Sequence, residues 1–157
     1  MARTALVRSR AFSLIELVIV VVIIGIIAAI AVPRLSRGAE GAADSSVAAN
    51  LAVLRNAIEM FKTEHGGTLP TEADIVAQLT QFTDDAGAVS ATRTTTHIYG
   101  PYLRVVPPLP VGTRKGSAGI AAADGVGIGW LYDEATGTIT ANTGTLRDAR
   151  NVLYSSY

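Results

Sequence analysis

The stretch that decides the fold is SRAFSLIELVIVVVIIGIIAAIAVP, which runs from Ser9 to Pro33 in a chain of 157 residues. Within it, Phe12 to Val32 is an apolar run of 21 residues with one charged side chain, Glu16. As a helix rising about 1.5 Å per residue, this run would extend roughly 32 Å, close to the hydrocarbon thickness of a bilayer. In lipid every backbone polar group must be bonded internally, so a single span has to be helical. We therefore expect residues 12–32 to form a transmembrane helix.

The charge of Glu16 does not prevent insertion of this helix. From Leu17 onward the run contains twelve Leu, Ile or Val residues, which together favour insertion by about 4–7 kcal/mol. A carboxylate costs about 3 kcal/mol at mid-membrane and less near a helix end, where Glu16 lies. Insertion is therefore favoured, and the charge still requires an explanation. The simplest one is that the side chain reaches the polar interface.

Two other interpretations of the run give Glu16 no role. A secretory signal peptide would combine the basic leader, the apolar segment and a cleavage site at Ala29-Ile30-Ala31, but its apolar segment is usually only about 7–15 residues long. A plain single-pass anchor would need the apolar run alone. Neither requires a carboxylate at this position.

Charge is balanced overall but unevenly distributed. The chain has thirteen basic and thirteen acidic side chains, so its net charge indicates neither a nucleic acid nor an acidic substrate. Arg3, Arg8 and Arg10 place three positive charges and no negative charge before Phe12. We interpret this first basic segment as a topogenic or leader sequence. The absence of cysteine from the sequence excludes disulfides, a thiolate nucleophile and cysteine-ligated zinc.

The sequence AFSLIEL, with a basic leader before it and an apolar helix after it, resembles the processing and methylation signature of type IV pilins and type II secretion pseudopilins. The resemblance implies that a prepilin peptidase cuts between Ala11 and Phe12, which makes residues 1–11 a cytoplasmic leader peptide, and methylates the new N-terminus at Phe12. Glu16, Gly25 and Pro33 then become the fifth, fourteenth and twenty-second residues of the processed chain, where the family places these residue types. Ala11 departs from the family pattern, which has glycine before the cut, but its side chain is small enough for cleavage to be expected.

Processing would give Glu16 a partner. Cleavage frees an α-amino group at Phe12, which is largely cationic at neutral pH. The resemblance also implies a filament in which neighbouring helices are staggered along the axis, so the amine of one subunit can meet the carboxylate of the next. Leaving one member of a buried ion pair alone typically costs about 3–5 kcal/mol. Our hypothesis is that Glu16 sets the register of assembly.

Three further features of the N-terminal region bear on assembly. Gly25, with the alanines that follow it, would form a small-residue patch that lets helices approach closely. Pro33 lacks a backbone N–H and is expected to kink or weaken the helix where it leaves the membrane. The sequence RLSRGAEGAADSS, from Arg34 to Ser46, has small residues and few apolar anchors. We expect this segment to be flexible.

Beyond this segment an apolar stripe recurs at helical spacing. It consists of Val47, Leu51, Leu54, Ile58 and Phe61. Steps of four and three residues place these side chains on one helix face, and the pattern stops at His65-Gly66-Gly67. We expect residues 33–64 to continue the N-terminal helix and this stripe to pack on a head formed by residues 65–157. The opposite face is expected to carry Asn50, Arg55, Asn56, Glu59 and Lys62.

The predicted fold class is α+β. In LPTEADIVAQLTQF, Thr71 is expected to cap a short helix with an apolar face made of Ile75, Val76, Leu79 and Phe82. Residues 83–96 are expected to form a loop, and HIYGPYLRVVPPLPVG an extended, irregular segment. Two β-prone runs around DEATG predict a hairpin. The long helix, transmembrane in its first half and amphipathic in its second, would thus pack on a small head with a short helix and a β-hairpin or small antiparallel sheet.

Two segments of the predicted head, YGPYLRVVPPLP and GWLYDEATGTI, resemble parts of the major pseudopilins of type II secretion. The resemblance raises the question of calcium, because major pseudopilins often bind it in a C-terminal loop. Here AAADGVGIG offers only Asp124, whereas calcium takes about six to eight oxygen ligands. We therefore expect no metal and no cofactor, with calcium as the alternative, and interpret Asp124 as a turn residue.

No arrangement of residues indicates catalysis. The two histidines, His65 and His97, lack zinc spacing, and no nucleophile elbow or phosphate-binding loop occurs. Asp84-Asp85 and Asp133-Glu134 are adjacent pairs typical of solvated loops. Arg114-Lys115 is too short to form a nucleic-acid patch. The chain is not expected to be an enzyme or to bind nucleic acid.

The resemblance implies a structural subunit of a type II secretion pseudopilus or a related type IV-like filament. Before assembly it would be a single-pass protein of the bacterial inner (cytoplasmic) membrane with its head in the periplasm. Its partners would be further copies of itself, minor pseudopilins, the prepilin peptidase, the inner-membrane assembly platform and membrane lipid. The nearest alternative is a true type IV pilin of a surface fibre serving adhesion, motility or DNA uptake. The absence of the cysteine pair that is frequent in such pilins favours the pseudopilin. An alternative of a different class is a membrane-anchored binding domain that forms no filament.

Overall fold

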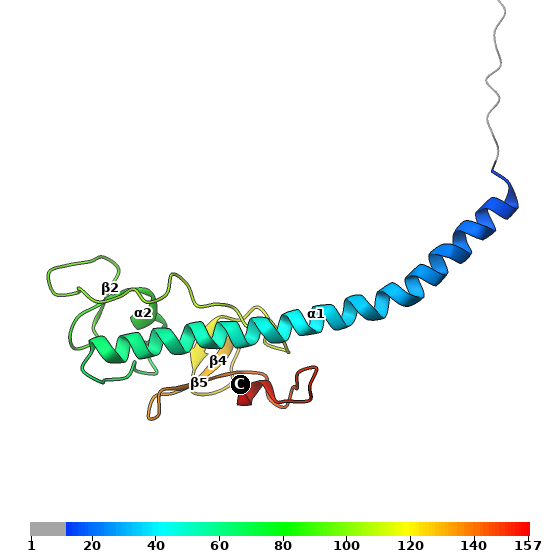
Figure 1. The fold of residues 1–157 in the computed structure, drawn as a ribbon. Coiled ribbons are helices and arrows are strands. Elements are labelled where there is room, and N and C mark those ends of the chain that lie inside the picture. Colours follow the sequence, from blue (N-terminus) through cyan, green and yellow to red (C-terminus); the bar gives the residue numbers. More distant parts are fainter. Residues whose placement is uncertain (1–11) are drawn as a thin grey trace, which may run out of the picture. The chain divides into compact units, whose positions relative to one another are not determined.

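The computed structural model describes residues 12–157, except for the side chains of Pro33, Ser36 and Arg37. These residues form one long helix, one short helix, two small sheets and a final 3-10 turn (Figure 1). They divide into two compact units, one that ends at Ala39 and one that comprises Glu40–Tyr157. The predicted α+β class is confirmed: a long apolar N-terminal helix precedes a small head with a short helix and small sheets.

The long helix, α1, runs from Leu14 to Glu64 and comprises 51 residues. It continues through Pro33 and through the segment from Arg34 to Ser46, so the expectation of a flexible segment there was wrong. Helix propagation adds one hydrogen bond for each residue it fixes, and several alanines of this segment are good helix formers. The Ser46 hydroxyl donates to the Ala42 carbonyl at 2.8 Å, a local bond that serines inside helices commonly make.

The end of α1 is set by two consecutive glycines. Gly66 and Gly67 have φ of 63° and 92°, and the Gly67 amide donates to the Lys62 carbonyl at 2.8 Å. A hydrogen bond from an amide to the carbonyl five residues earlier is typical of the Schellman motif, which satisfies free carbonyls at a helix C-terminus. Because φ is positive at both positions, glycine is the residue that ends the helix here without strain.

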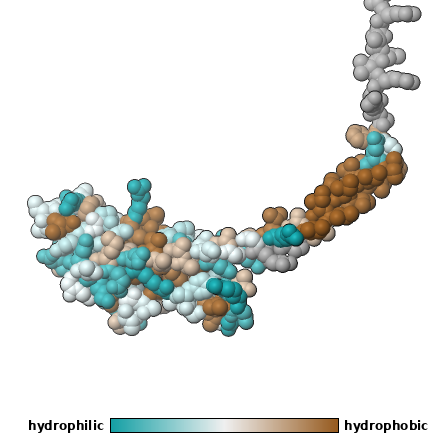
Figure 2. Space-filling view, in the orientation of Figure 1, coloured by the Kyte–Doolittle hydropathy of each residue, from teal (hydrophilic) through white to brown (hydrophobic). Residues whose placement is uncertain are grey.

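The first unit is dominated by the apolar part of α1. Leu14–Val32 is long and apolar enough to cross a membrane, and none of it is buried within the chain. Figure 2 shows this part of the helix as a continuous hydrophobic surface. Among the described residues it is the one candidate membrane span. An apolar surface of this extent is not stable in water and requires lipid or other apolar helices around it.

The short helix, α2, spans Ile75–Thr80 and begins one turn later than Thr71. Its N-cap is Asp74 rather than Thr71, so the predicted capping residue was wrong. The Thr71 backbone amide instead donates to the Gln78 side-chain oxygen at 2.9 Å. Phe82, expected on the apolar face of this helix, is the first residue of a strand. The helix is therefore shorter than its sequence pattern predicts.

A two-stranded antiparallel sheet lies within the region predicted as a loop. β1, Phe82–Thr83, pairs with β2, Val89–Ser90. The connection is held by Asp84, whose Oδ1 accepts bonds from the amides of Ala86 at 3.0 Å and Ala88 at 2.9 Å. An aspartate that bonds to backbone amides a few residues ahead stabilises a tight turn. The remainder of residues 91–96 has no helix or strand.

The second sheet has the order β3-β4-β5. β4, Ile128–Asp133, and β5, Thr138–Ala141, form the predicted antiparallel hairpin around residues 134–137. β3, Gly119–Ala121, was not predicted and pairs in parallel with β4. A side chain at Gly129 would place Cβ only 2.2 Å from the Ser117 carbonyl oxygen. The close approach of these two segments therefore requires glycine at this position.

One hydrophobic core joins α1 to the sheet and to α2. Its largest side chains include Trp130, Tyr132 and Phe61, and Figure 1 shows α1 passing across β4 and β5. The indole N–H of Trp130 and the hydroxyl of Tyr132, both on β4, form hydrogen bonds to backbone carbonyls. Trp130 donates to the Pro107 carbonyl at 2.8 Å, and Tyr132 donates to the Pro70 carbonyl at 3.0 Å.

Candidate functional site

The first turn of α1 brings together the residues of the AFSLIEL motif that are described. Glu16 Oε2 accepts a hydrogen bond from the Ser13 backbone amide at 2.8 Å, and the Leu17 amide donates to the Ser13 carbonyl at 3.2 Å. This geometry is the glutamate half of a capping box, in which an acidic residue bonds to the amide of the residue that precedes the helix. Sequence reasoning missed this contact, although its signal, S-x-x-E, was present in Ser13-Leu14-Ile15-Glu16.

The predicted cleavage site lies at the edge of the described chain. Phe12 is 85% exposed, and Ala11, with the rest of the predicted leader, lies outside the described residues. Glu16 is also exposed, so it has no partner in a hydrophobic core of its own chain. Its carboxylate points to the backbone of the helix start, within one turn of Phe12.

Gly25 has no structural role that the chain itself requires. A methyl group added at this position would meet nothing within 4 Å, yet glycine inside a helix costs about 1 kcal/mol relative to alanine. At Pro33 the helix backbone continues without interruption. The predicted assembly residues Glu16, Gly25 and Pro33 therefore all belong to α1, and Glu16 and Gly25 are exposed.

The predicted packing stripe lies in the second unit. Its five side chains are between 0% and 1% exposed and belong to the hydrophobic core: Val47, Leu51, Leu54, Ile58 and Phe61. The prediction for the opposite face requires a correction, because two of its residues are turned toward their own unit. Asn50 donates to the Pro108 carbonyl at 3.1 Å, and Arg55 donates to the Ile139 carbonyl at 3.3 Å.

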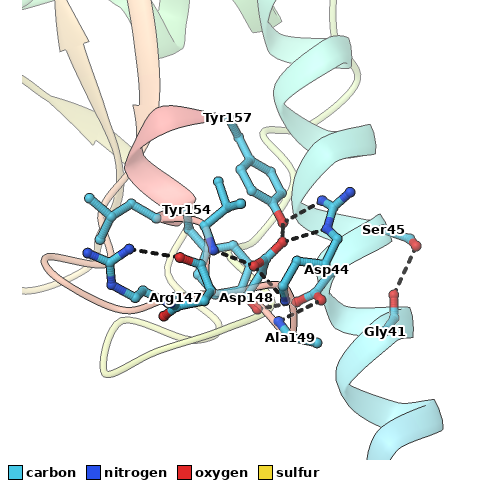
Figure 3. A network of polar contacts seen from close by, with 12 residues as sticks. Gly41, Asp44, Ser45, Arg147, Asp148, Ala149, Tyr154 and Tyr157 are labelled. Atoms are coloured by element: carbon cyan, nitrogen blue, oxygen red, sulfur yellow. Dashed lines mark hydrogen bonds and ion pairs between the residues drawn. The ribbon is translucent and has the colours of Figure 1, made fainter.

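A polar network fastens the C-terminal segment to α1 (Figure 3). Asp44 accepts a hydrogen bond from the Tyr154 hydroxyl and another from the Ala149 amide at 3.2 Å. Burial, followed by the bond to Asp44, raises the pKa of Tyr154 above its usual value. The contacts join residues more than 100 positions apart in the sequence, and no local sequence signal could have identified them.

The centre of this network is the buried carboxylate of Asp148. Its Oδ2 accepts a bond from the Tyr157 hydroxyl at 2.6 Å and one from Arg150 Nε at 3.0 Å. Its Oδ1 accepts bonds from the amides of Arg150 and Val152 at 2.8 and 2.7 Å. The hydrogen bond from Tyr157, supported by these amides, lowers the pKa of Asp148 to about 2. The network is structural, since each oxygen is already occupied by donors of the same chain.

Asp124 is engaged by two other side chains. Arg114 contacts it through Nε and a terminal nitrogen at 2.8 and 3.0 Å, and Asn142 donates to it at 2.8 Å. The bond from Arg114 is the largest cause that lowers the pKa of Asp124, to about 2. Within residues 12–157 no group of three or more histidine, aspartate or glutamate side chains could hold a metal ion.

Comparison with known proteins gives one match. Residues 6–32 match the family model described as the prokaryotic N-terminal methylation motif. No curated protein and no solved structure matches the chain. The match covers residues 6–11 of the predicted leader, the first turn of α1 with Glu16, and the apolar span. The chain therefore carries a prepilin-type N-terminal methylation motif, which makes this end of it similar to the pilin and pseudopilin superfamily.

Proposed function

We propose that this protein is a pseudopilin-like structural subunit of a type II secretion system or a related type IV-like filament. The observation that carries the proposal is the placement of one carboxylate, Glu16, four residues after Phe12 at the start of an exposed apolar helix, inside the matched motif. Prepilin peptidase cuts between Ala11 and Phe12, and the second unit, Glu40–Tyr157, stays in the periplasm.

Assembly joins the N-terminal helices of several copies. The new amine of Phe12 on one subunit pairs with Glu16 of its neighbour, which neutralises two charges that neither lipid nor an apolar helix bundle accommodates singly. Gly25 supports this arrangement, since it leaves open space on the helix surface where a neighbouring helix can approach. Minor pseudopilins, the assembly platform and membrane lipid complete the set of partners.

Two variants of Glu16 separate the pairing role from the capping role. Glu16→Gln keeps an oxygen that can accept the Ser13 amide but removes the charge, whereas Glu16→Ala removes both. We expect both variants to insert into the membrane and neither to enter filaments, as measured by filament yield from cells whose outer membrane has been removed. If Glu16→Gln assembles like the unchanged protein and only Glu16→Ala fails, the capping bond explains the glutamate and the register hypothesis is wrong.

Mass spectrometry of the mature N-terminus tests the processing step. An N-methylated phenylalanine at Phe12 is the expected result. Retention of Met1 would support a plain anchored domain, and a mature end at Val32 would support a signal peptide. The same measurement on both Glu16 variants controls for a loss of processing that would imitate an assembly defect.

A true type IV pilin of a surface fibre remains the second candidate for the filament type. The lack of cysteine in the sequence and the segment from Tyr99 to Pro110, which resembles major pseudopilins, favour the pseudopilin. Electron microscopy distinguishes the two: long fibres outside the cell support a pilin, whereas short filaments confined to the periplasm support a pseudopilin.

A further inference from the structure

The connection from β3 to β4, residues 122–127, is anchored at one carboxylate, that of Asp124. Arg114 Nε donates to Asp124 Oδ1 at 2.8 Å, and Arg114 Nη2 donates to Asp124 Oδ2 at 3.0 Å. A guanidinium that binds both oxygens of one carboxylate forms a strong and directional pair of charged hydrogen bonds. The carboxylate therefore has a cation in a fixed position beside it.

Asn142 extends this contact into the second sheet. It directly follows β5 and is only 6% exposed. Its side-chain nitrogen donates to Asp124 Oδ1 and to the Ile128 carbonyl, both at 2.8 Å, and its backbone amide donates to the Gly129 carbonyl at 2.9 Å. Asp124 therefore joins three segments: the turn that carries Arg114, the β3–β4 connection and the end of the hairpin.

The pair of Arg114 and Asp124 differs from an ordinary ion pair on a protein surface, which contributes little because two mobile side chains must be ordered in water. The Arg114 side chain is 29% exposed, so most of it is already packed. The turn that carries it is held by its own backbone bonds, since the Ser117 amide donates to the Arg114 carbonyl at 3.0 Å and the Gly116 amide to the Leu109 carbonyl at 2.8 Å. The guanidinium thus starts from a backbone that is fixed independently of Asp124.

The groups around Asp124 do not suit the calcium ion that was the alternative for this loop. Calcium takes about six to eight oxygen ligands, whereas both oxygens of this carboxylate already accept hydrogen bonds from Arg114. Asn142 directs its nitrogen at the carboxylate, because the second partner of that nitrogen, the Ile128 carbonyl, is also an acceptor. A positive guanidinium at this distance would in addition repel a divalent cation.

We infer that the guanidinium of Arg114 acts at Asp124 as a built-in cation, which neutralises the carboxylate, fixes the β3–β4 connection to the sheet and makes the fold of Glu40–Tyr157 independent of calcium. The inference goes beyond the proposed function and does not depend on it, because it concerns the folding of the second unit rather than processing or assembly. Arginine stays protonated in proteins and is covalently attached. The neutralisation of Asp124 therefore does not vary with the concentration of any ion.

Thermal unfolding of the full-length protein in detergent tests the independence from calcium. Fluorescence of Trp130, which is fully buried, reports on the second unit. We expect the same unfolding temperature with excess calcium chloride, with the same concentration of magnesium chloride and with a calcium chelator. A specific ligand raises the stability of the folded state by mass action, so a higher unfolding temperature with calcium than with magnesium would overturn the inference.

Substitution of Arg114 tests the role of its guanidinium. Arg114→Ala is expected to lower the unfolding temperature by a few degrees and to speed hydrogen–deuterium exchange of residues 122–128 several-fold. Arg114→Lys keeps a positive charge but not the planar fork, and is expected to lie between Arg114→Ala and the unchanged protein. Lys115→Ala removes the neighbouring, exposed cation and is the matched control, which should leave both measurements unchanged. Equal results for Arg114→Ala and Lys115→Ala would contradict the inference.

A double-mutant cycle shows whether Arg114 acts through Asp124. In a chain that already carries Asp124→Ala, the guanidinium has no carboxylate to neutralise, so adding Arg114→Ala should change the unfolding temperature and the exchange of residues 122–128 much less than it does in the unchanged chain. An equal change in both chains would show that Arg114 acts through another contact, and the inference would then be wrong.

Discussion

Asp148 shows how a single carboxylate organises the C-terminal segment of this protein. Four donors converge on its two oxygens, and its side chain is fully excluded from solvent. A buried charge is stable only when it is hydrogen-bonded, so the ionised form is strongly preferred in the folded state. Loss of this charge would destabilise the C-terminal segment, because several hydrogen-bond donors would then lack a charged acceptor.

The first prediction concerns the pH dependence that follows from Asp148. Its pKa is lowered to about 2 in the folded protein, below the value near 3.9 typical of an unfolded chain. The stabilisation is therefore fully present above the unfolded pKa and is lost as the pH falls from about 4 toward 2. Urea unfolding at a series of pH values should show a decline in stability over this interval. In Asp148→Asn the decline should be smaller, because only Asp124 and other carboxylates then contribute; an unchanged decline would contradict the assignment.

Gly137 gives a second prediction at a single position. It has φ of 72° at the end of the β4–β5 turn, and a Cβ there would lie 2.7 Å from Leu69 Cδ2. Gly137→Ala is expected to destabilise the protein in two ways. The left-handed backbone costs about 1–2 kcal/mol for an L-residue, and the new methyl group crowds Leu69. We expect the free energy of unfolding to fall by at least that amount in a urea titration. Gly144→Ala is the matched control: φ is also positive, at 58°, but nothing lies within 4 Å of the added methyl.

At the level of elements, α1 stabilises the second unit through its buried stripe. Leu54 is completely buried, whereas Val53 on the same turn is about half exposed. Leu54→Ala is expected to destabilise the protein by about 2–5 kcal/mol, the usual cost of removing a buried leucine side chain. Val53→Ala should cost well below 1 kcal/mol, as surface substitutions usually do. Thermal unfolding followed by Trp130 fluorescence compares the two, and equal effects would contradict the packing described here.

The elements that the sequence predicted correctly are those with a long or local pattern. The apolar run and the stripe from Val47 to Phe61 specify α1 over many turns, and the turn residues after Asp133 specify the hairpin. Thr71 was wrong as the cap, because α2 begins only at Ile75 and the Thr71 hydroxyl forms no hydrogen bond with the described residues. β3 is three residues long and pairs with β4 through glycine contacts, which no periodicity reveals.

The candidate site follows the same division. Ala11, Phe12 and Glu16 were predicted from one continuous motif, and their roles in processing and assembly stay predictions. The capping contact from Glu16 to Ser13 was also readable, since it depends on residues three apart. The Asp44–Tyr154 contact was not, because it depends on the fold of the whole second unit.

At the scale of the whole molecule, the two units depend on different environments. The span Leu14–Val32 is not buried by any of the described residues and stays helical in lipid or detergent because its backbone must remain internally bonded. Glu40–Tyr157 has its own core, with Trp130 at 0% exposure, and its stability comes from burying apolar surface away from water. Urea therefore acts on the second unit and leaves the first largely intact.

This difference predicts two separate responses of the full chain in detergent micelles. Increasing urea should move Trp130 emission to that of a fully solvated indole in one transition. The helical signal in far-UV circular dichroism should fall over the same transition and then level off at about a third of its starting value. The reason is that the span contributes 19 helical residues, whereas α1 and α2 together contain 51 and 6. A chain whose helical signal vanished together with the Trp130 transition would show that the span depends on the second unit. The buried stripe supplies the control: Leu54→Ala should shift the common transition to lower urea without changing the residual signal, since Leu54 lies outside the span.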